Sequence, residues 1–152
     1  AGHQSQVEST SFSRNNARVL TWSADSIKLW DSMTGECLQT LSGHAGSFLC
    51  AALSADAALV LTTSCDSSAK IWNATTGQCL QELWGHESQV NKAVFSTDNA
   101  MVATASNDKA AKIWKSKSGE CLRTLLGHES KVFEASFSAD STLVLTLAGD
   151  ST

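Results

Sequence analysis

The chain has 152 residues with a formal net charge of −4; 42% of the residues are hydrophobic and 17% are charged. This composition is typical of a folded globular chain rather than a disordered one, and the negative charge disfavours a nucleic-acid partner. No apolar run approaches the ~18 residues of a transmembrane helix, so we expect no membrane insertion.

The cysteines bear on the compartment. The chain has five of them, an odd number, and none is in the Cys-x-x-Cys spacing of metal or redox motifs. This pattern favours reduced, buried structural thiols in an intracellular protein of the cytoplasm or nucleus.

An internal repeat dominates the sequence. The dipeptide Gly-His recurs at intervals of 41, 42 and 42 residues, and a tryptophan recurs three times at a spacing of 42. The Gly-His pairs lie at Gly2-His3, Gly43-His44, Gly85-His86 and Gly127-His128. Self-similarity at a fixed period indicates a repeat architecture. We therefore place repeats at about 2–42, 43–84, 85–126 and 127–152, the last one truncated.

The elements of one repeat follow in chain order. Apolar residues alternate after Gly-His, and a Ser-x-Asp-x turn follows, as at 54–57. A β-rich run comes next (59–62), then a turn centred on Asp, a strand ending in Trp (69–72) and a Cys-Leu-x-x-Leu strand (79–83). Four short strands in about 42 residues predict one antiparallel sheet per repeat and an all-β protein with no useful length of helix.

These features together resemble the WD-repeat β-propeller family. They are Gly-His at the repeat start, the Ser-x-Asp-x turn, the Asp turn and the Lys-(Ile/Leu)-Trp strand, and they extend over the whole chain. The sequence departs from the family in two ways. Trp-Asp survives only at Trp30-Asp31, and the usual proline of the first turn is replaced in every repeat. The replacements are Arg14, Ala55, Thr97 and Ala139.

A polar set recurs with the repeats. A hydroxyl, a His and an Asp could form a catalytic triad. The resemblance implies instead a buried structural tetrad of His, Thr, Asp and Trp, and repetition favours this interpretation because catalytic sites are normally singular. The tetrad residues are His3, Thr21, Asp25, Trp30, His44, Thr62, Asp66, Trp72, His86, Thr104, Asp108 and Trp114, with His128, Thr146 and Asp150 in the truncated repeat. We expect no enzyme activity, metal or cofactor.

The resemblance also implies a partner-binding face built from three positions per repeat. Two lie three and five residues after the His, and one lies just before the tetrad Asp. They are Gln6, Glu8, Ala24, Ser47, Leu49, Cys65, Gln89, Asn91, Asn107, Lys131, Phe133 and Gly149. Among these, Phe133 and Leu49 are the strongest candidates for anchors, and Lys131 could steer an acidic partner.

The number of repeats limits the architecture. The pattern predicts 14 strands, or about three and a half blades, whereas propellers typically have 4–8. We therefore expect a partial, open arc that belongs to a longer chain or a larger assembly. The function implied is a non-catalytic scaffold for other proteins or peptides, with no small-molecule substrate. The alternatives are a regulatory or sensor segment of a larger enzyme or signalling protein, and an RNA- or chromatin-associated propeller.

Overall fold

The computed structural model describes residues 2–150, which form fourteen β-strands and no helix. This confirms the all-β prediction and the strand count. The strands are β1 Val7–Phe12, β2 Arg18–Ser23, β3 Ile27–Asp31, β4 Cys37–Leu41, β5 Phe48–Leu53, β6 Leu59–Ser64, β7 Ala69–Asn73, β8 Cys79–Leu83, β9 Val90–Phe95, β10 Met101–Ser106, β11 Ala111–Lys115, β12 Cys121–Leu125, β13 Val132–Phe137 and β14 Val144–Ala148.

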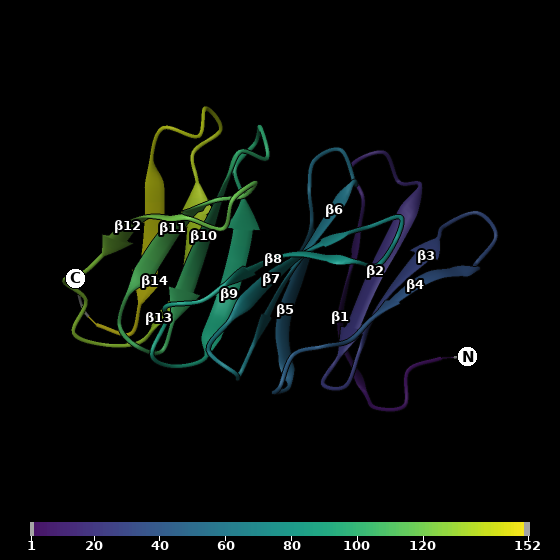
Figure 1. Ribbon diagram of the computed structural model, residues 1–152, viewed down its shortest axis with the longest axis horizontal. Helices are drawn as coiled ribbons and strands as arrows, with labels where there is room; N and C mark the ends of the chain where they lie inside the picture. Colours follow the sequence, from purple (N-terminus) through teal and green to yellow (C-terminus); the bar gives the residue numbers. More distant parts are fainter. Residues whose placement is uncertain (1, 151–152) are drawn as a thin grey trace.

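The strands form four separate antiparallel sheets, which we call blades one to four. Blades one to three are four-stranded, with orders β1-β2-β3-β4, β5-β6-β7-β8 and β9-β10-β11-β12, and blade four is the pair β13-β14. The blades follow one another from the N-terminus to the C-terminus, and the two ends of the chain lie at opposite ends of the row (Figure 1). The arc is therefore open (Figure 1), as the number of repeats predicted.

The turn between the first two strands of each blade is formed by a Ser and an Asp or Asn. In blade two the Ser54 hydroxyl donates to Asp56 Oδ1 at 2.6 Å and accepts the Leu59 N–H at 2.9 Å. The chain then turns through Ala57, whose φ is +57°. Side-chain bonds to the nearby backbone fix this turn without a proline.

Apolar clusters join each blade to the next. One face of blade one contributes Leu20, Ile27, Leu29 and Leu41 to the same cluster as Trp72 of blade two. Blade two repeats this arrangement, because Leu61, Ile71 and Leu83 cluster with Trp114 of blade three. Blades one and two thus each cover the tryptophan of the following blade with their aliphatic face.

The five cysteines are all free thiols. Cys37, Cys50 and Cys79 are half-buried, whereas Cys65 and Cys121 are exposed. The expectation of uniformly buried thiols is therefore wrong for two of them.

Candidate functional site

Blade three contains the most completely buried tetrad. The Trp114 indole N–H donates to Thr104 Oγ1 at 2.9 Å, and Thr104 Oγ1 lies 2.7 Å from His86 Nε2. The other ring nitrogen, His86 Nδ1, lies 2.7 Å from Asp108 Oδ2. Because the Asp108 carboxylate can only accept, Nδ1 of the neutral imidazole carries the proton and donates it to Asp108, and Nε2 accepts from the Thr104 hydroxyl.

Blade two has the same chain of bonds between equivalent residues. Trp72 Nε1, Thr62 Oγ1, His44 and Asp66 are linked by three contacts of 2.9 Å each. The imidazoles of His44 and His86 are 0% exposed. Repetition of one geometry at two places indicates a structural network rather than a singular site.

The aspartates also hold the loops around them. Asp108 accepts the backbone N–H of Glu87 and that of Ala110, each at 3.0 Å. Asp66 accepts the N–H of Ala45 at 2.9 Å and that of Ser68 at 3.0 Å. Each carboxylate therefore joins the loop that carries Gly-His to the turn between the second and third strands of its blade.

Burial and hydrogen bonding set the protonation states of these groups. Burial lowers the pKa of His44 and of His86, although hydrogen bonds to the partner aspartates raise it in part. Burial also acts to raise the pKa of Asp66, but hydrogen bonds from Ser68 and His44 outweigh it and lower this pKa to about 2. At neutral pH the pair is a neutral imidazole and a carboxylate.

The threonine hydroxyls of blades two and three are not available as nucleophiles. Thr62 and Thr104 are 0% exposed, and each is enclosed by a tryptophan that is itself at most 4% exposed. A triad nucleophile must reach a substrate carbonyl. These two networks therefore lack the access that the catalytic interpretation requires.

Blade one departs from the predicted tetrad. His3 Nε2 and the Trp30 indole both reach Thr21 Oγ1, at 2.7 and 2.8 Å. However, His3 Nδ1 contacts Ser23 Oγ at 2.9 Å and Ser26 Oγ at 3.0 Å. The structure places Asp25 with two hydroxyls instead, those of Ser5 and Ser23.

A shorter turn explains this difference. In blade two the Ser64 N–H bonds Ser68 O across three residues, one of which, Ser67, has a φ of +68°. In blade one the Ser23 N–H bonds Ser26 O across only two residues. The residue missing from blade one is the one that adopts positive φ in the three-residue turn of blade two. Without it, the shorter turn does not bring the Asp25 carboxylate to the His3 imidazole.

Blade four keeps a looser version of the set. His128 Nε2 lies 2.8 Å from Thr146 Oγ1, and His128 Nδ1 lies 3.2 Å from Asp150 Oδ2. Asp150 also accepts the backbone N–H of Glu129 at 2.7 Å. All three residues predicted for this blade are therefore brought together.

The predicted binding positions share a feature that sequence reasoning missed. In each blade the first strand is out of register with the second by one residue, and that extra residue is Glu8, Leu49, Asn91 or Phe133. A β-bulge re-aims the side chain that it carries. These four positions project from the sheets because of bulges, whereas regular strand alternation would not by itself single them out.

Three candidate positions of blade three bond to one another. Asn91 Nδ2 donates to Asn107 Oδ1 and to Val132 O of blade four, each at 2.8 Å, and Gln89 Nε2 donates to Asn91 Oδ1 at 3.2 Å. All three side chains are half-buried. They form a polar network that joins two blades, and their exposed edges lie on the predicted face.

The blade-four positions are more open. Phe133 is 49% exposed, and Lys131 is also exposed. A Cβ added at Gly149 would lie 3.2 Å from Phe133 Cε2, so the ring lies over the glycine backbone. The Gly149 N–H bonds Lys131 O at 3.0 Å and thereby holds the three positions together.

The remaining predicted positions belong to blades one and two. Ser47 and Cys65 are exposed and are linked by a bond of 3.0 Å from Cys65 N–H to Ser47 O, whereas Leu49 is half-buried. Gln6, Glu8 and Ala24 are exposed. The face therefore carries one large exposed aromatic side chain, Phe133, among smaller or polar groups.

Two further observations on the described residues concern metal ligands and membrane spans. Residues 2–150 contain no group of three or more His, Cys, Asp or Glu side chains placed to hold a metal ion. The same part of the chain contains no helix that is long and apolar enough to span a membrane.

The comparisons agree with the repeat pattern. The family model of the WD domain, G-beta repeat, matches residues 35–73, 77–115 and 119–152, more than half of the chain. Human angio-associated migratory cell protein is 44% identical over 68 residues, 44% of this chain and 16% of that protein. Human WD repeat-containing protein 3 is 46% identical over 41 residues, 27% of this chain and 4% of that protein. The chain thus spans a small part of the length of these relatives.

Proposed function

Because the chain belongs to the WD40 repeat family, we propose that it acts as a non-catalytic interaction scaffold, whose bulge-bearing face binds a peptide or protein. The observation that carries this proposal is Phe133, a 49% exposed aromatic side chain at a β-bulge beside the exposed Lys131. A rigidly held aromatic residue next to a cation is a common interface anchor.

The chemistry of this face favours a partner with an apolar group and a nearby acid. Phe133 offers a flat apolar surface over Gly149, and Lys131 supplies an exposed positive charge two residues earlier in the chain. Charge of this kind steers encounter and adds specificity more than affinity. Both Asn91 amide protons are already bonded, so next to this ring the Asn107 amide N–H groups are the donors that can bond an extended backbone.

A second candidate function is that of a regulatory segment in a larger protein. The relatives are far longer than the region they share with this chain. In addition, Leu143, just before β14, and Leu145 and Leu147 of β14 are 59–72% exposed on one face of blade four. An aliphatic face of this kind covers the next tryptophan elsewhere in the chain. A further blade or domain packed there would make the chain one part of a longer propeller.

Paired substitutions test the scaffold proposal. Phe133→Ala and Leu49→Ala are introduced into the full chain, and the partners captured from the native source are compared with those of the unchanged protein. We expect the partner set to shrink for Phe133→Ala. Met33→Ala is the matched control, because Met33 is 89% exposed and lies in a turn at the other end of blade one. An unchanged partner set for both test variants would contradict the proposal.

A further inference from the structure

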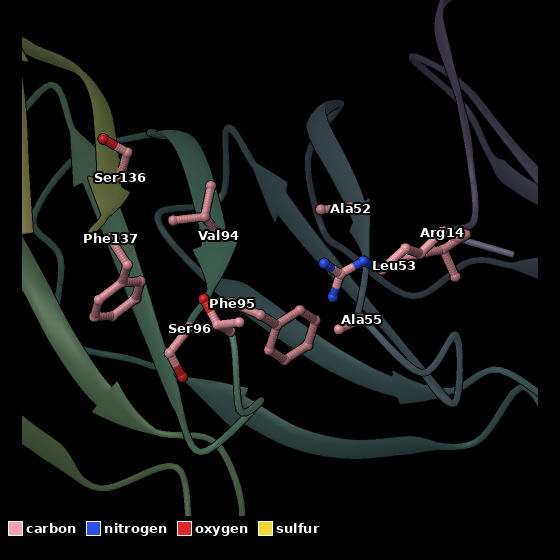
Figure 2. A pocket seen from close by; sticks show the side chains of 10 residues that line it. Arg14, Ala52, Leu53, Ala55, Val94, Phe95, Ser96, Ser136 and Phe137 are labelled. Atoms are coloured by element: carbon pink, nitrogen blue, oxygen red, sulfur yellow. The ribbon is translucent and has the colours of Figure 1, made fainter. Parts of the chain in front are cut away.

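A cavity of about 480 Å³ lies at the opposite end of the first strands from the bulges. Its apolar wall is made by Leu53, Phe95 and Phe137, the last residues of β5, β9 and β13. Figure 2 shows the two phenyl rings together with Val94 and Ser96, and Arg14 facing them from blade one. The cavity therefore combines side chains of four successive blades.

Arg14 gives this cavity its charge. It lines both this cavity and an adjoining one of about 350 Å³, which Phe12 also lines. No other ionisable side chain lines either cavity. Within residues 2–150 the Arg14 guanidinium has no hydrogen bond or ion pair, and it is directed toward the space beside Phe95 (Figure 2).

Asp56 and Asp98, which follow the cavity residues Ala55 and Thr97 in the sequence, are engaged in their own turns. Asp56 accepts the Ser54 hydroxyl at 2.6 Å and the Ala58 N–H at 3.1 Å. Asp98 accepts the Ser96 hydroxyl at 2.6 Å and the Ala100 N–H at 3.0 Å. The first turn differs, since it has Asn15 at the equivalent position and Arg14 just before it. The positive charge over the cavity is thus left for an external acid.

We propose that this cavity is a second binding site, for an extended peptide in which a large apolar side chain is flanked by a carboxylate. The apolar side chain packs against Phe95 and Phe137, and the carboxylate accepts charge-assisted hydrogen bonds from Arg14. Ser136 and Thr97 also line the cavity; the Thr97 hydroxyl donates to Ala139 O at 3.1 Å, so toward a peptide backbone it can only accept.

This site is separate from the face proposed above. Phe133 and Phe137 lie near opposite ends of β13, roughly 13 Å apart at about 3.3 Å per residue. A ligand at Arg14 therefore leaves Phe133 and Lys131 accessible. The two sites can fail independently, and variants at Phe133 serve as controls for variants at Arg14.

The test uses a defined probe, the peptide acetyl-Gly-Glu-Phe-Glu-Gly-amide, titrated into the ¹⁵N-labelled full chain and followed by amide chemical shifts. We expect shifts concentrated at 52–55, 94–97, 136–137 and 14. A probe with Gln in place of both Glu residues, and one with Ala in place of Phe, should each bind about tenfold more weakly, because one loses the charge and the other the apolar contact. Raising the salt concentration should weaken only the acidic probe.

Two variants change exposed side chains of the cavity, so that a loss of binding does not reflect a loss of folding. Arg14→Ala removes an exposed side chain without internal bonds and should weaken binding about tenfold. Ala55→Trp should block the cavity by bulk, since Ala55 is exposed and lines it. Lys117→Ala is the matched control, because it removes another exposed cation outside both cavities. Equal binding of the acidic and neutral probes, unchanged binding by Arg14→Ala, or an absence of shifts at 52–55, 94–97 and 136–137 would each overturn the proposal.

Discussion

Blades one and three carry the same residue types in nearly the same order, yet their polar networks differ. In blade three His86 and Trp114 are buried against the aliphatic face of blade two. In blade one His3 and Trp30 are half-buried, and Ser23 and Ser26 take the place of an aspartate at the imidazole. The difference between the two blades shows that a buried tetrad has two separate requirements, although the repeat places the same residue types in both blades.

The first requirement is a neighbouring blade. Trp72 and Trp114 are each covered by the leucines and isoleucines of the blade before them, and this cover excludes water from the hydrogen bonds beneath. The second requirement is the length of one turn, because the residue with positive φ returns the aspartate to the histidine. Buried polar networks stabilise a structure only when both the shielding and the partners are present.

The tryptophans should show the largest difference between the two blades. Trp114→Ala removes a side chain that is 1% exposed and should lower the free energy of unfolding by about 3–5 kcal/mol. Trp30→Ala removes a half-buried one and should cost about 2 kcal/mol or less. Urea denaturation measures both, and Trp114→Phe, which keeps most of the apolar contact, is the control. Similar losses for the two alanine variants would argue against the role of the covering blade.

The aspartates of blades one and three should also differ in how much they contribute to the free energy of unfolding. Asp108→Ala leaves the His86 Nδ1–H and the Ala110 N–H without an acceptor and should lower the free energy of unfolding by about 2 kcal/mol. Asp25→Ala removes only contacts to serine hydroxyls and should cause a clearly smaller loss. Thermal unfolding of both variants checks this order, and a larger loss for Asp25→Ala would reverse our interpretation of blade one.

Acid should weaken the middle blades in two stages. Burial lowers the pKa values of folded His44 and His86, so below about pH 6.5 the unfolded chain binds protons that the folded chain does not, and stability falls. The pKa of folded Asp66 is about 2, against 3.8 for the free side chain. Its contribution is present above pH 4 and is lost as the pH falls toward 2.

Unfolding temperatures measured from pH 7 to pH 2 check this expectation. His86→Gln is the control for the first stage, and Asp66→Asn is the control for the second, because each removes one titrating group. Constant stability from pH 7 down to pH 5 would contradict the assignment of buried, neutral imidazoles.

The smallest expected effect comes from restoring the turn of blade one. Insertion of one Ser between Asp25 and Ser26 copies the turn that contains Ser67 and should return Asp25 to His3. We expect a gain of up to about 1 kcal/mol, the net value of one hydrogen bond near the surface. Insertion at the same place of a Pro, which cannot adopt positive φ, is the control and should not give the gain.

Much of this architecture can be predicted from the repeat. The spacing of Gly-His and Trp predicts four sheets and the pairing of His44 with Thr62, because each blade repeats one register. The single-residue deletion is also visible in the sequence. The effect of this deletion is not visible in the sequence. Asp25 bonds Ser5 and Ser23 instead of His3 because of the geometry of the turn, not because of a change in residue type.

The binding face illustrates a different limit. The positions of Leu49 and Phe133 can be predicted from their offset to the His, but the bulges that aim them have no sequence signature here. The cavity beside Arg14 is harder still to predict, because it combines residues that are up to 123 positions apart. Only the replacement of proline by arginine in the first turn marks it in the sequence.

Exchange of the tryptophan indole protons tests the central claim most directly, that each blade shields the network of the next. In an ¹⁵N-labelled chain moved into D₂O, the Trp72 and Trp114 Nε1–H signals should persist about as long as the slowest backbone amides. The Trp30 signal should decay much sooner. Equal protection of all three indoles, or faster exchange at Trp114 than at Trp30, would contradict the claim.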